Sequence, residues 1–536
     1  MSVADAAPIS RRAFLAGSAA TGVVLLAGPA DVRLAHGAVV RRYPFALGVA
    51  SGDPLPHRVV LWTRLVRDPL DASSMPRRPV AVEWELSRHP RFRGARRHGV
   101  VRALPRLAHS VHVDVGGLRP ATDYWYRFRV GRHVSETGRT RTAPEHGAAI
   151  QHLRLGVANC QDWQSGYWPA YTALAGEDLD VVLHLGDYIY ESDPASAYRD
   201  RLHTKPHRSG LNQLFTLADY RNRHALYKTD PALQAAHAAF PWVVTWDDHE
   251  VESNYANRVD ADPHRPRRQG PVRFARERAR AYQAYYEHMP IRVPYRVGSP
   301  NLRIYRRFDF GNLLRLNVLD TRQYRTPQPD DRGGGYGAED AGRANTHGTL
   351  MGSGQERWLH AGLRSSPARW NVIAQQVMMS RLRFPTEPGQ TQYVTNLDQW
   401  DGYAPARDRL LHFLSTARVA NPVVLAGDLH ASCFSDVRLN FDDPNSQIVA
   451  SEYLATSISS GFAPGDDAAL KAANPTLNPH IRHFDGARRG YLRIDVNRQR
   501  VQVEQRSVDT IATRSSPVRT TAAFVTAAGS PGVVPA

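Results

Sequence analysis

The chain has 536 residues. A single hydrophobic core seldom stabilises a chain of this length, so we expect two or three domains. Hydrophobic residues make up 42% of the chain and charged residues 22%, which excludes an intrinsically disordered protein. Its only cysteines, Cys160 and Cys433, allow at most one disulfide, which excludes a disulfide-stapled scaffold. The net charge of +17 favours acidic partners such as phosphate esters, cell-wall polymers or lipid headgroups.

Residues 1–38 have the pattern of a twin-arginine export signal. Residues 10–15 read SRRAFL, and a weakly apolar stretch rich in Gly and Ala follows. Twin arginines ahead of such a stretch are typical of export in the folded state. The pattern predicts a partner, the twin-arginine export machinery, and a protein that is secreted or located in the cell wall or periplasm. No internal window supplies the roughly 18 apolar residues of a membrane span, so we expect none in the mature protein.

Residues 39–142 predict a β-sandwich domain, because short alternating strands are separated there by Pro and Gly turns. The segment LRPATDYWYRF, residues 118–128, places Tyr124 and Tyr126 at the spacing of a tyrosine corner. We therefore expect an all-β domain of the fibronectin or immunoglobulin type, with both tyrosines packed in its core.

Residues 152–512 predict an α/β (α+β) catalytic domain. Apolar strands alternate with helical patterns at 217–228, 271–288, 354–364 and 404–417, and polar clusters follow several strands directly. Functional groups gather outside the carboxyl ends of strands in such sheets, so we expect one shared site. A pair of hairpin strands follows near the C-terminus, and residues 513–536 are expected to form a mobile tail.

The strand ends bring titratable side chains into one crevice: Cys160, Asp187, Tyr190, Asp248, His249, Asp428 and His430. So many anionic groups repel one another unless a multivalent cation holds them, which favours a metal centre over a proton-transfer dyad. Two neighbouring metals suit phosphoryl hydrolysis, because they bind the phosphoryl group and activate a water.

Seven motifs in order resemble the PhoD-type alkaline phosphatases, members of the calcineurin-like metallophosphoesterase superfamily related to purple acid phosphatases. They are FALGVASGDPLPHRVVLWTRL at 45–65, then ANCQ, HLGDYIYE, WDDHE, LDTRQYR, AQQVMMS and GDLHAS. The resemblance implies a metallophosphoesterase sandwich fold with two metals, Fe³⁺ and Ca²⁺.

The resemblance implies that Cys160, Asp187, Tyr190 and His430 bind Fe³⁺, with Asp187 bridging to the second metal. Thiolate and phenolate donors independently favour a trivalent iron over Zn or Mg. The carboxylates of Asp187, Asp248 and Asp428 suit a hard ion such as Ca²⁺, although the residues alone leave Mn or Zn open at the second site.

Asn254 follows WDDHE closely enough to reach the second metal or a further calcium. Asp247 either binds metal, orients His249 or caps the loop. Gln375 or Gln376 stands where related phosphatases place a histidine ligand. The resemblance assigns His249 to the leaving group, and Arg322, with Arg325, is a candidate phosphate clamp. We expect Cys433 to serve packing alone.

These features predict a secreted, metal-dependent alkaline phosphatase or phosphodiesterase that hydrolyses phosphate mono- or diesters through a metal-bound hydroxide. One alternative is a phosphodiesterase of the phospholipase D type. Another, from a different class, is a cell-surface binding protein with a degenerate catalytic domain. No nucleic-acid-binding module is readable, so no stable nucleic-acid partner is expected.

Replacing Arg11 and Arg12 together by Lys should block export, because the twin-arginine pathway reads this pair. Immunoblots of cell and extracellular fractions should show the precursor retained in the cytoplasm. Undiminished protein outside the cell would contradict the assignment of the signal.

Overall fold

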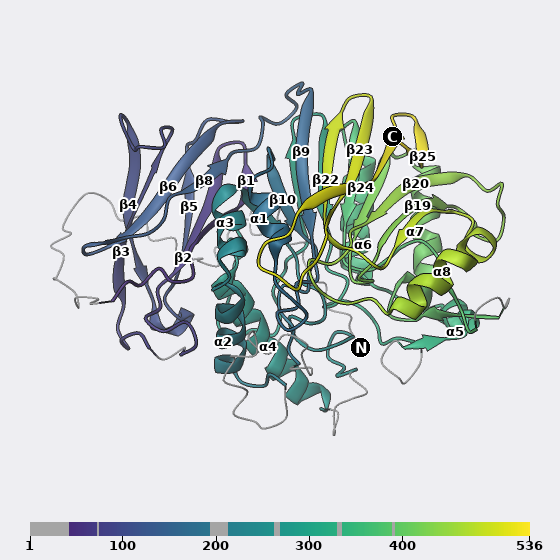
Figure 1. Ribbon diagram of the computed structural model, residues 1–536, viewed down its shortest axis with the longest axis horizontal. Coiled ribbons are helices and arrows are strands. Elements are labelled where there is room, and N and C mark those ends of the chain that lie inside the picture. The colour runs from purple at the N-terminus through teal and green to yellow at the C-terminus, as the bar shows by residue number, and fades with distance from the viewer. Residues whose placement is uncertain (1–41, 72–73, 193–212, 262–268, 330–334, 388–391) are drawn as a thin grey trace, which may run out of the picture.

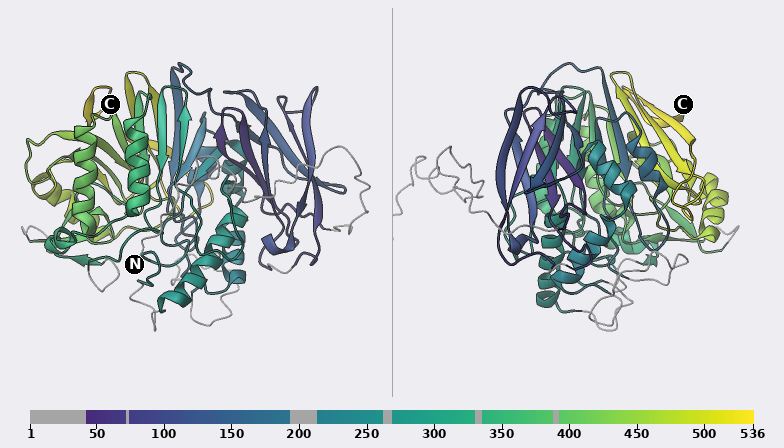
Figure 2. Two further views of the ribbon diagram at one scale, coloured as in Figure 1. Left: turned by 180° about the vertical axis from the view of Figure 1, so that it is seen from behind. Right: turned by 60° about the vertical axis from the view of Figure 1, so that its left-hand side comes forward.

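The computed structural model describes residues 42–71, 74–192, 213–261, 269–329, 335–387 and 392–536, so the proposed export signal lies outside it. Two large β-sheets pack face to face, and helices cover their outer faces (Figure 1 and Figure 2). A smaller β-sheet lies at one end of the molecule. The mixed architecture of sheets and helices expected from the sequence is therefore confirmed.

The first large sheet has ten strands, and its central strands β9, β10, β11 and β1 are parallel. In spatial order the strands are β25 (Ser530–Pro535), β24 (Val518–Ala527), β23 (Arg500–Val508), β22 (Arg489–Asn497), β9 (His152–Ala158), β10 (Val181–His184), β11 (Pro241–Val244), β1 (Val49–Leu55), β2 (Arg58–Arg64) and β5 (Ser110–Gly116).

The second large sheet has seven strands, and β13, β15, β18 and β20 are parallel at its centre. Its strands are β12 (Arg306–Phe310), β13 (Leu314–Val318), β15 (Trp370–Ala374), β18 (Pro422–Ala426), β20 (Ile448–Leu454), β19 (Ser432–Arg438) and β21 (Ile481–Asp485). A three-stranded sheet of β14 (Tyr336–Gly337), β17 (Tyr393–Asn396) and β16 (Arg383–Pro385) is separate from both large sheets.

The helices begin and end close to the predicted bounds. The helical patterns at 217–228, 271–288, 354–364 and 404–417 correspond to α2, α4, α6 and α7. The eight α-helices within the described residues are α1 (Pro169–Ala175), α2 (Leu217–Tyr227), α3 (Pro231–Ala239), α4 (Pro271–His288), α5 (Glu339–Ala344), α6 (Gly352–Arg364), α7 (Ala404–Thr416) and α8 (Pro464–Leu477). Within the described part of the chain, none of these helices is long and apolar enough to cross a bilayer.

The main core lies between the two large sheets. Leu155 and Leu183 of the ten-stranded sheet pack with Leu316, Val372 and Tyr453 of the seven-stranded sheet. Helices α1 to α4 form a second core on the outer face of the ten-stranded sheet, and α6 and α7 form a third on the seven-stranded sheet. Burial on both faces explains why the central strands read as continuous apolar runs.

The N-terminal β-region is joined to the rest of the fold through a shared sheet. Strands β3 (Val80–Ser87), β4 (Arg96–Ala103), β6 (Asp123–Val130), β7 (His133–Val134) and β8 (Gly138–Arg141) form a five-stranded sheet. Strands β1, β2 and β5 instead extend the ten-stranded sheet, where Ser51 pairs with Pro241 and Gly52 with Trp242. The domains predicted at 39–142 and 152–512 therefore have one sheet in common.

Both tyrosines of the predicted tyrosine corner are buried in the core between these sheets. Tyr124 and Tyr126 are 5% and 0% exposed, and the hydroxyl of Tyr124 accepts a hydrogen bond of 2.8 Å from the backbone N–H of Arg119. A hydroxyl that returns to the backbone a few residues upstream is the contact that a tyrosine corner makes.

The prediction of a mobile tail at residues 513–536 is wrong. Strand β24 pairs with β23 along its length, and β25 turns back against β24. Strand β25 also reaches the seven-stranded sheet, where the backbone N–H of Val533 donates to Asp436 and the hydroxyl of Ser451 donates to the carbonyl of Gly532. The small residues and glycines that resemble a linker allow this strand to lie close to both sheets.

A lysine is buried where α2 meets the N-terminal strands. Lys228 is 2% exposed, and its Nζ lies 4.4 Å from the ring centre of Trp62 and 3.4 Å from Nε2 of His237. Burial lowers the pKa of Lys228 from 10.5 to about 7. The unfolded chain therefore binds more protons than the folded chain between about pH 7 and pH 10, so the free energy of unfolding rises with pH across this range.

Replacing Lys228 by Met should remove this gain on alkalinisation. Between pH 7.5 and 9 the wild-type chain should gain up to about 1.4 kcal/mol per pH unit relative to Lys228→Met. Calorimetric melting at both pH values measures the difference. The control is Lys471→Met, because the side chain of Lys471 is 42% exposed and should leave the pH dependence unchanged. Parallel pH profiles for Lys228→Met and the wild type would contradict the prediction.

Candidate metal centre

Parallel strands of both sheets end at the same edge, and the predicted site residues follow these ends. Cys160 comes two residues after β9, Asp187 three after β10, Asp248 four after β11, and Asp428 two after β18. The structure therefore places side chains from four strands around one point, although they are separated by up to 268 residues in the chain.

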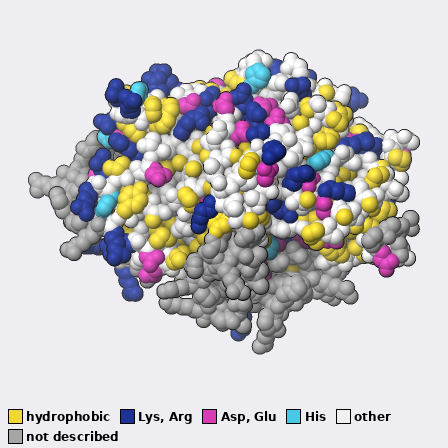
Figure 3. Space-filling model, in the orientation of Figure 1, with side chains coloured by type: hydrophobic (Ala, Val, Ile, Leu, Met, Phe, Trp, Pro, Cys, Tyr) yellow, Lys and Arg dark blue, Asp and Glu magenta, His cyan; other side chains and the backbone are white. Residues whose placement is uncertain are grey.

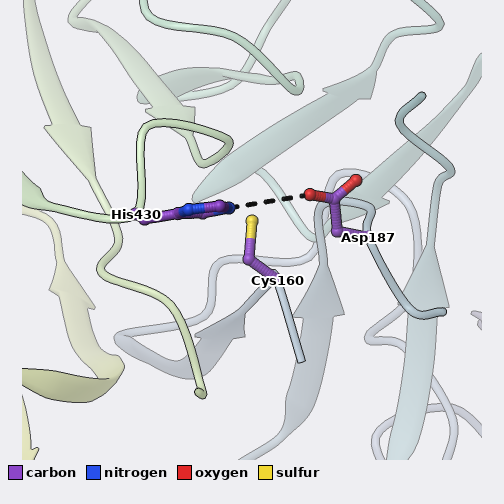
Figure 4. Close-up of side chains that lie close together, drawn as sticks. All are labelled: Cys160, Asp187 and His430. Atoms are coloured by element: carbon purple, nitrogen blue, oxygen red, sulfur yellow. Dashed lines mark ion pairs between the residues drawn. The ribbon is translucent and has the colours of Figure 1, made fainter. Parts of the chain in front are cut away.

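Four donors of different chemistry converge in the first part of the site. The ligating atoms of Cys160, Asp187 and His430 all lie within 4.8 Å of one another. The Tyr190 hydroxyl lies 2.9 Å from Oδ2 of Asp187 and 3.1 Å from Nε2 of His430. Figure 4 shows the imidazole of His430 and the carboxylate of Asp187 facing each other, with the thiol of Cys160 beside the line that joins them. His430 Nε2 and Asp187 Oδ2 are 3.9 Å apart.

The backbone at these residues adopts a conformation that side chains with a Cβ rarely take. The φ angles of Cys160, Asp187, Asp428 and His430 are 53°, 54°, 65° and 62°. Left-handed residues other than glycine cost free energy and persist only where the surroundings hold them. Here all four of these strained residues direct side chains to the site.

Two features hold the loops after β10 and β11 together. Gly186 has φ of 116°, and a Cβ there would come within 2.4 Å of Cβ of Asp247, so only glycine allows this approach. The buried carboxylate of Glu250 accepts backbone N–H groups from Asp187, Tyr188 and Asp247, at 3.1, 2.6 and 2.7 Å. Glu250 thereby fixes the loop of Asp187 against the loop that carries Asp248.

A second set of oxygen ligands adjoins the first and shares Asp187 with it. Asp187, Asp248 and His249 form one group of close ligand atoms, and Asp247, Asp248 and Asp428 form another. The backbone N–H of Asn254 donates to Oδ2 of Asp248 at 2.6 Å. The main chain of Asn254 therefore positions Asp248, whereas its side-chain amide was the predicted metal ligand.

Arg322 lies among carboxylates and is completely buried. Its Nε pairs with Asp247, its Nη1 lies 2.7 Å from Asp398, and its Nη2 lies 3.1 Å from Asp428 and 3.4 Å from Asp248. Each nitrogen of the guanidinium thus faces a carboxylate, which leaves none directed at a substrate phosphate. The geometry favours a role in positioning the second set of ligands over the predicted phosphate clamp.

The neighbouring Arg325 is also buried and pairs with Asp398 at 2.6 Å. Gln376 accepts the backbone N–H of Thr321, and Gln375 accepts the indole N–H of Trp400, so both glutamines complete hydrogen bonds at the end of β15. Cys433 is buried in a separate apolar cluster, as its predicted packing role requires.

The electrostatics of the site fit a multivalent cation. Burial, and then the charge of Asp187, raise the pKa of the Cys160 thiol and of the Tyr190 phenol well above their ordinary values. Oδ1 of Asp187 is buried without a hydrogen-bond partner among the described residues. A bound cation supplies a partner to this oxygen and lowers the pKa of both neighbours, because it favours their anionic forms.

His249 is paired with an acid that the sequence did not single out. Its Nδ1 lies 2.7 Å from Oε2 of Glu191, and its Nε2 lies 4.0 Å from Oδ2 of Asp248, on the metal-ligand side. Burial alone would lower the pKa of His249, but Glu191 and then Asp248 raise it well above its ordinary value. The carboxylate of Glu191 therefore favours the protonated imidazole and fixes its orientation.

Ser460 is a second residue that sequence reasoning missed. Its hydroxyl lies 2.6 Å from the phenol oxygen of Tyr190 and 2.9 Å from the carbonyl oxygen of Cys160. The segment TSISSG follows β20 directly, so the pattern of a strand followed by polar residues also applied there. Glu191 carried a weaker signal, since it ends the segment GDYIYE without ligand spacing of its own.

The fold and the site are those of a metal-dependent phosphoesterase: two packed sheets whose strand ends carry mixed sulfur, oxygen and nitrogen donors, with one carboxylate common to two groups of possible metal ligands. Comparison with known proteins identifies the family. The model of the PhoD-like phosphatase family matches residues 155–505, and the model of the PhoD-like phosphatase N-terminal domain matches residues 32–144.

A relative, alkaline phosphatase D of Bacillus subtilis (strain 168), is 44% identical over 483 residues, which cover 90% of this chain and 81% of the relative. A solved structure described as that of PhoD superposes with a TM-score of 0.83 at 42% identity and covers 93% of each chain. The chain belongs to the PhoD-like phosphatase family and is a phosphoric ester hydrolase, which confirms the resemblance seen in the sequence.

Proposed function

We propose that this protein is an exported alkaline phosphatase or phosphodiesterase that uses a centre of Fe³⁺ and Ca²⁺. One observation carries the proposal: Asp187 belongs both to a group with Cys160 and His430 and to a group with Asp248 and His249. A carboxylate shared by two groups of ligands is what a bridged pair of metals requires. Two bound metals supply Lewis-acid stabilisation of the phosphoryl oxygens and activate a water at the pH of the reaction.

The ligands differ enough to separate the two metals. Cys160, Tyr190 and His430, with Asp187, would hold Fe³⁺, because a thiolate and a phenolate are strong anionic donors. Asp187, Asp248 and Asp428 offer only oxygen and would hold Ca²⁺. The backbone contacts of Asn254 and the ion pairs of Arg322 keep the second set in place.

The protein's own groups account for the remaining steps. The phosphoryl group of a mono- or diester lies at the edge where the strands end, with the leaving oxygen toward Nε2 of His249. His249 donates its proton to that oxygen as the ester bond breaks, and Glu191 holds Nδ1 so that Nε2 faces the substrate. The side chain of His249 is 20% exposed, so a substrate can reach it from solvent.

Two finer assignments belong to the same proposal. The twin arginines at 11 and 12 support export by the twin-arginine route to the periplasm, cell wall or medium. The Tyr124 contact supports a fibronectin-like origin of the N-terminal sandwich. The family membership and the convergence of donors favour an enzyme over a degenerate binding protein.

A substrate panel tests the class of ester on the metal-replete enzyme. We expect hydrolysis of phosphomonoesters and simple diesters with the highest kcat/KM. If kcat/KM for the release of choline from phospholipid exceeds kcat/KM for every other substrate, the enzyme is a phosphodiesterase of the phospholipase D type. The assignment of the metals then stands.

Replacing Cys160 by Ala should remove iron and the visible charge-transfer band that a thiolate or phenolate bound to Fe³⁺ gives. The reason is the loss of one anionic donor from a set of four. Elemental analysis and absorbance measure both effects. Cys433→Ala is the matched control, since Cys433 is equally buried but lies in an apolar cluster, and it should retain iron and colour. Active wild-type enzyme that contains only zinc would refute the assignment.

Replacing His249 by Ala should slow hydrolysis of an alkyl phosphate by about 10² to 10⁴-fold, and that of a nitrophenyl ester far less, because nitrophenolate leaves without a proton. Steady-state kinetics on both substrates decide the point. Equal losses on both would exclude His249 as the proton donor.

Replacing Glu191 by Gln should move the alkaline limb of the rate profile for the alkyl phosphate to lower pH, since the pKa of His249 falls when the neighbouring carboxylate is removed.

A further inference from the structure

Positive charge is concentrated in the N-terminal β-region, away from the metal centre. Residues 42–144 contain 19 Arg, no Lys and 8 Asp or Glu, a net charge of +11 out of the +17 of the whole chain. Hydrolysis of a phosphate ester at the strand ends does not require positive charge to be concentrated in residues 42–144. Figure 3 shows Lys and Arg side chains gathered at the end of the molecule where Figure 1 places β3, β4 and β6.

The outer face of the five-stranded sheet presents this charge in rows. Strand alternation and register place Arg96, Arg102, Arg127 and Arg129 on this face, together with His98. The opposing acids are Glu85, which pairs with Arg96 and Arg127, and Glu83, which lies 4.0 Å from Arg129. Three of the four arginines thus share two glutamates, and Arg102 forms no ion pair within the described residues, so the face retains a positive charge.

The hairpin between β3 and β4 adds charge without any counter-charge of its own. Residues 88–98, named here the 88–98 hairpin, contain five arginines, one of them the Arg96 already described, and no acidic residue. Arg88, Arg91 and Arg93 are exposed, and none forms an ion pair within the described residues. Phe92 is 7% exposed, and the guanidinium carbon of Arg127 lies 4.1 Å from the centre of its ring. Phe92 therefore fastens a cationic hairpin to the cationic sheet face.

A groove of about 400 Å³ lies on this surface. The groove is lined by Arg96, His98, Arg127 and Arg129, and by Glu83 and Glu85 of β3. We propose that this surface, the outer face of β4, β3 and β6 with the 88–98 hairpin, binds a linear polymer that carries a phosphate at each repeat, and so anchors the enzyme on it independently of the metal centre. Residues two apart on a strand are about 7 Å apart on one face, so successive arginines meet successive anionic groups of an extended chain.

The side chains of the surface favour this polymer over a nucleic acid and over a membrane. Nucleic-acid binding to single strands uses exposed aromatic rings on which bases stack. Here Phe92 is buried, and Trp84, which lines the groove, and Trp125 are only partly exposed. Binding in a membrane surface uses exposed apolar side chains, and Val100 is the one large hydrophobic residue of this face that is exposed among those described. Charge alone, without stacking or insertion, fits a flexible polyanion without bases.

The test measures binding of the full-length, metal-replete protein to inorganic polyphosphate by titration calorimetry at several salt concentrations. The triple variant R88Q/R91Q/R93Q should bind at least about tenfold more weakly at low salt, and the slope of log K against log salt should fall by up to about 2 units, since three contacts to the chain are lost. The control R357Q/R418Q/R500Q removes the same charge from exposed arginines outside residues 42–144 and should lose less than about twofold.

The hydrolysis of a small monoester serves as a second readout and should be the same in both triple variants and the wild type. Equal losses of polyphosphate binding in the two triple variants would overturn the proposal, because net charge alone would then explain it. Tighter binding of an oligothymidylate or of anionic phospholipid vesicles than of polyphosphate would also overturn it, in favour of a nucleic acid or a membrane. Binding is read without turnover, so a failure here is distinguishable from a failure of the catalytic proposal.

Discussion

Buried negative charge is the constraint on which the site depends. Asp187, Asp247, Asp248 and Asp398 are almost inaccessible to solvent, and Asp428 is only partly accessible. Carboxylates in a low-dielectric interior repel one another and lose their hydration, so positive charge must be supplied. Arg322 supplies one charge to four of them, and Asp187 lies beyond its reach, beside Cys160 and Tyr190. One guanidinium offsets only part of the charge of these four carboxylates, so the cluster keeps a negative charge that a bound cation would balance.

The same constraint explains how much of the site the sequence could predict. An acid or thiol directly after an apolar strand is visible as a pattern, because parallel strands bring their carboxyl ends to one edge. Cys160, Asp187, Asp248 and Asp428 are of this kind. Glu191 and Arg322 are not, because the partner of a side chain depends on how two loops approach in space. An arginine has the same sequence signature whether it meets a phosphate or a carboxylate, so the sequence alone could not separate a phosphate clamp at Arg322 from the ion pairs that the structure shows.

The fold, like the site, has elements that nearby residues determine and elements that distant contacts determine. Helices α2, α4, α6 and α7 were predictable because their periodicity and caps, such as the capping box of Thr216 and Asp219, are local. The role of the last strands was not, because β24 and β25 are rich in Ala, Gly, Pro and Thr and resemble a linker when read alone. Their place is set by β23 and by β19 and β20 of the seven-stranded sheet, and neither contact leaves a trace in nearby residues.

The ten-stranded sheet joins parts of the chain that are synthesised far apart in time. Strand β9, which leads to Cys160, has β22 as one neighbour, with Val157 opposite Leu492. While the chain is still on the ribosome, β9 lacks that neighbour, and the apolar faces of β9 and β10 have only part of their cover. Contacts of such sequence separation form late and slowly. The strand that leads to Cys160 is therefore fully supported only after β22 has been synthesised, more than 300 residues later in the chain.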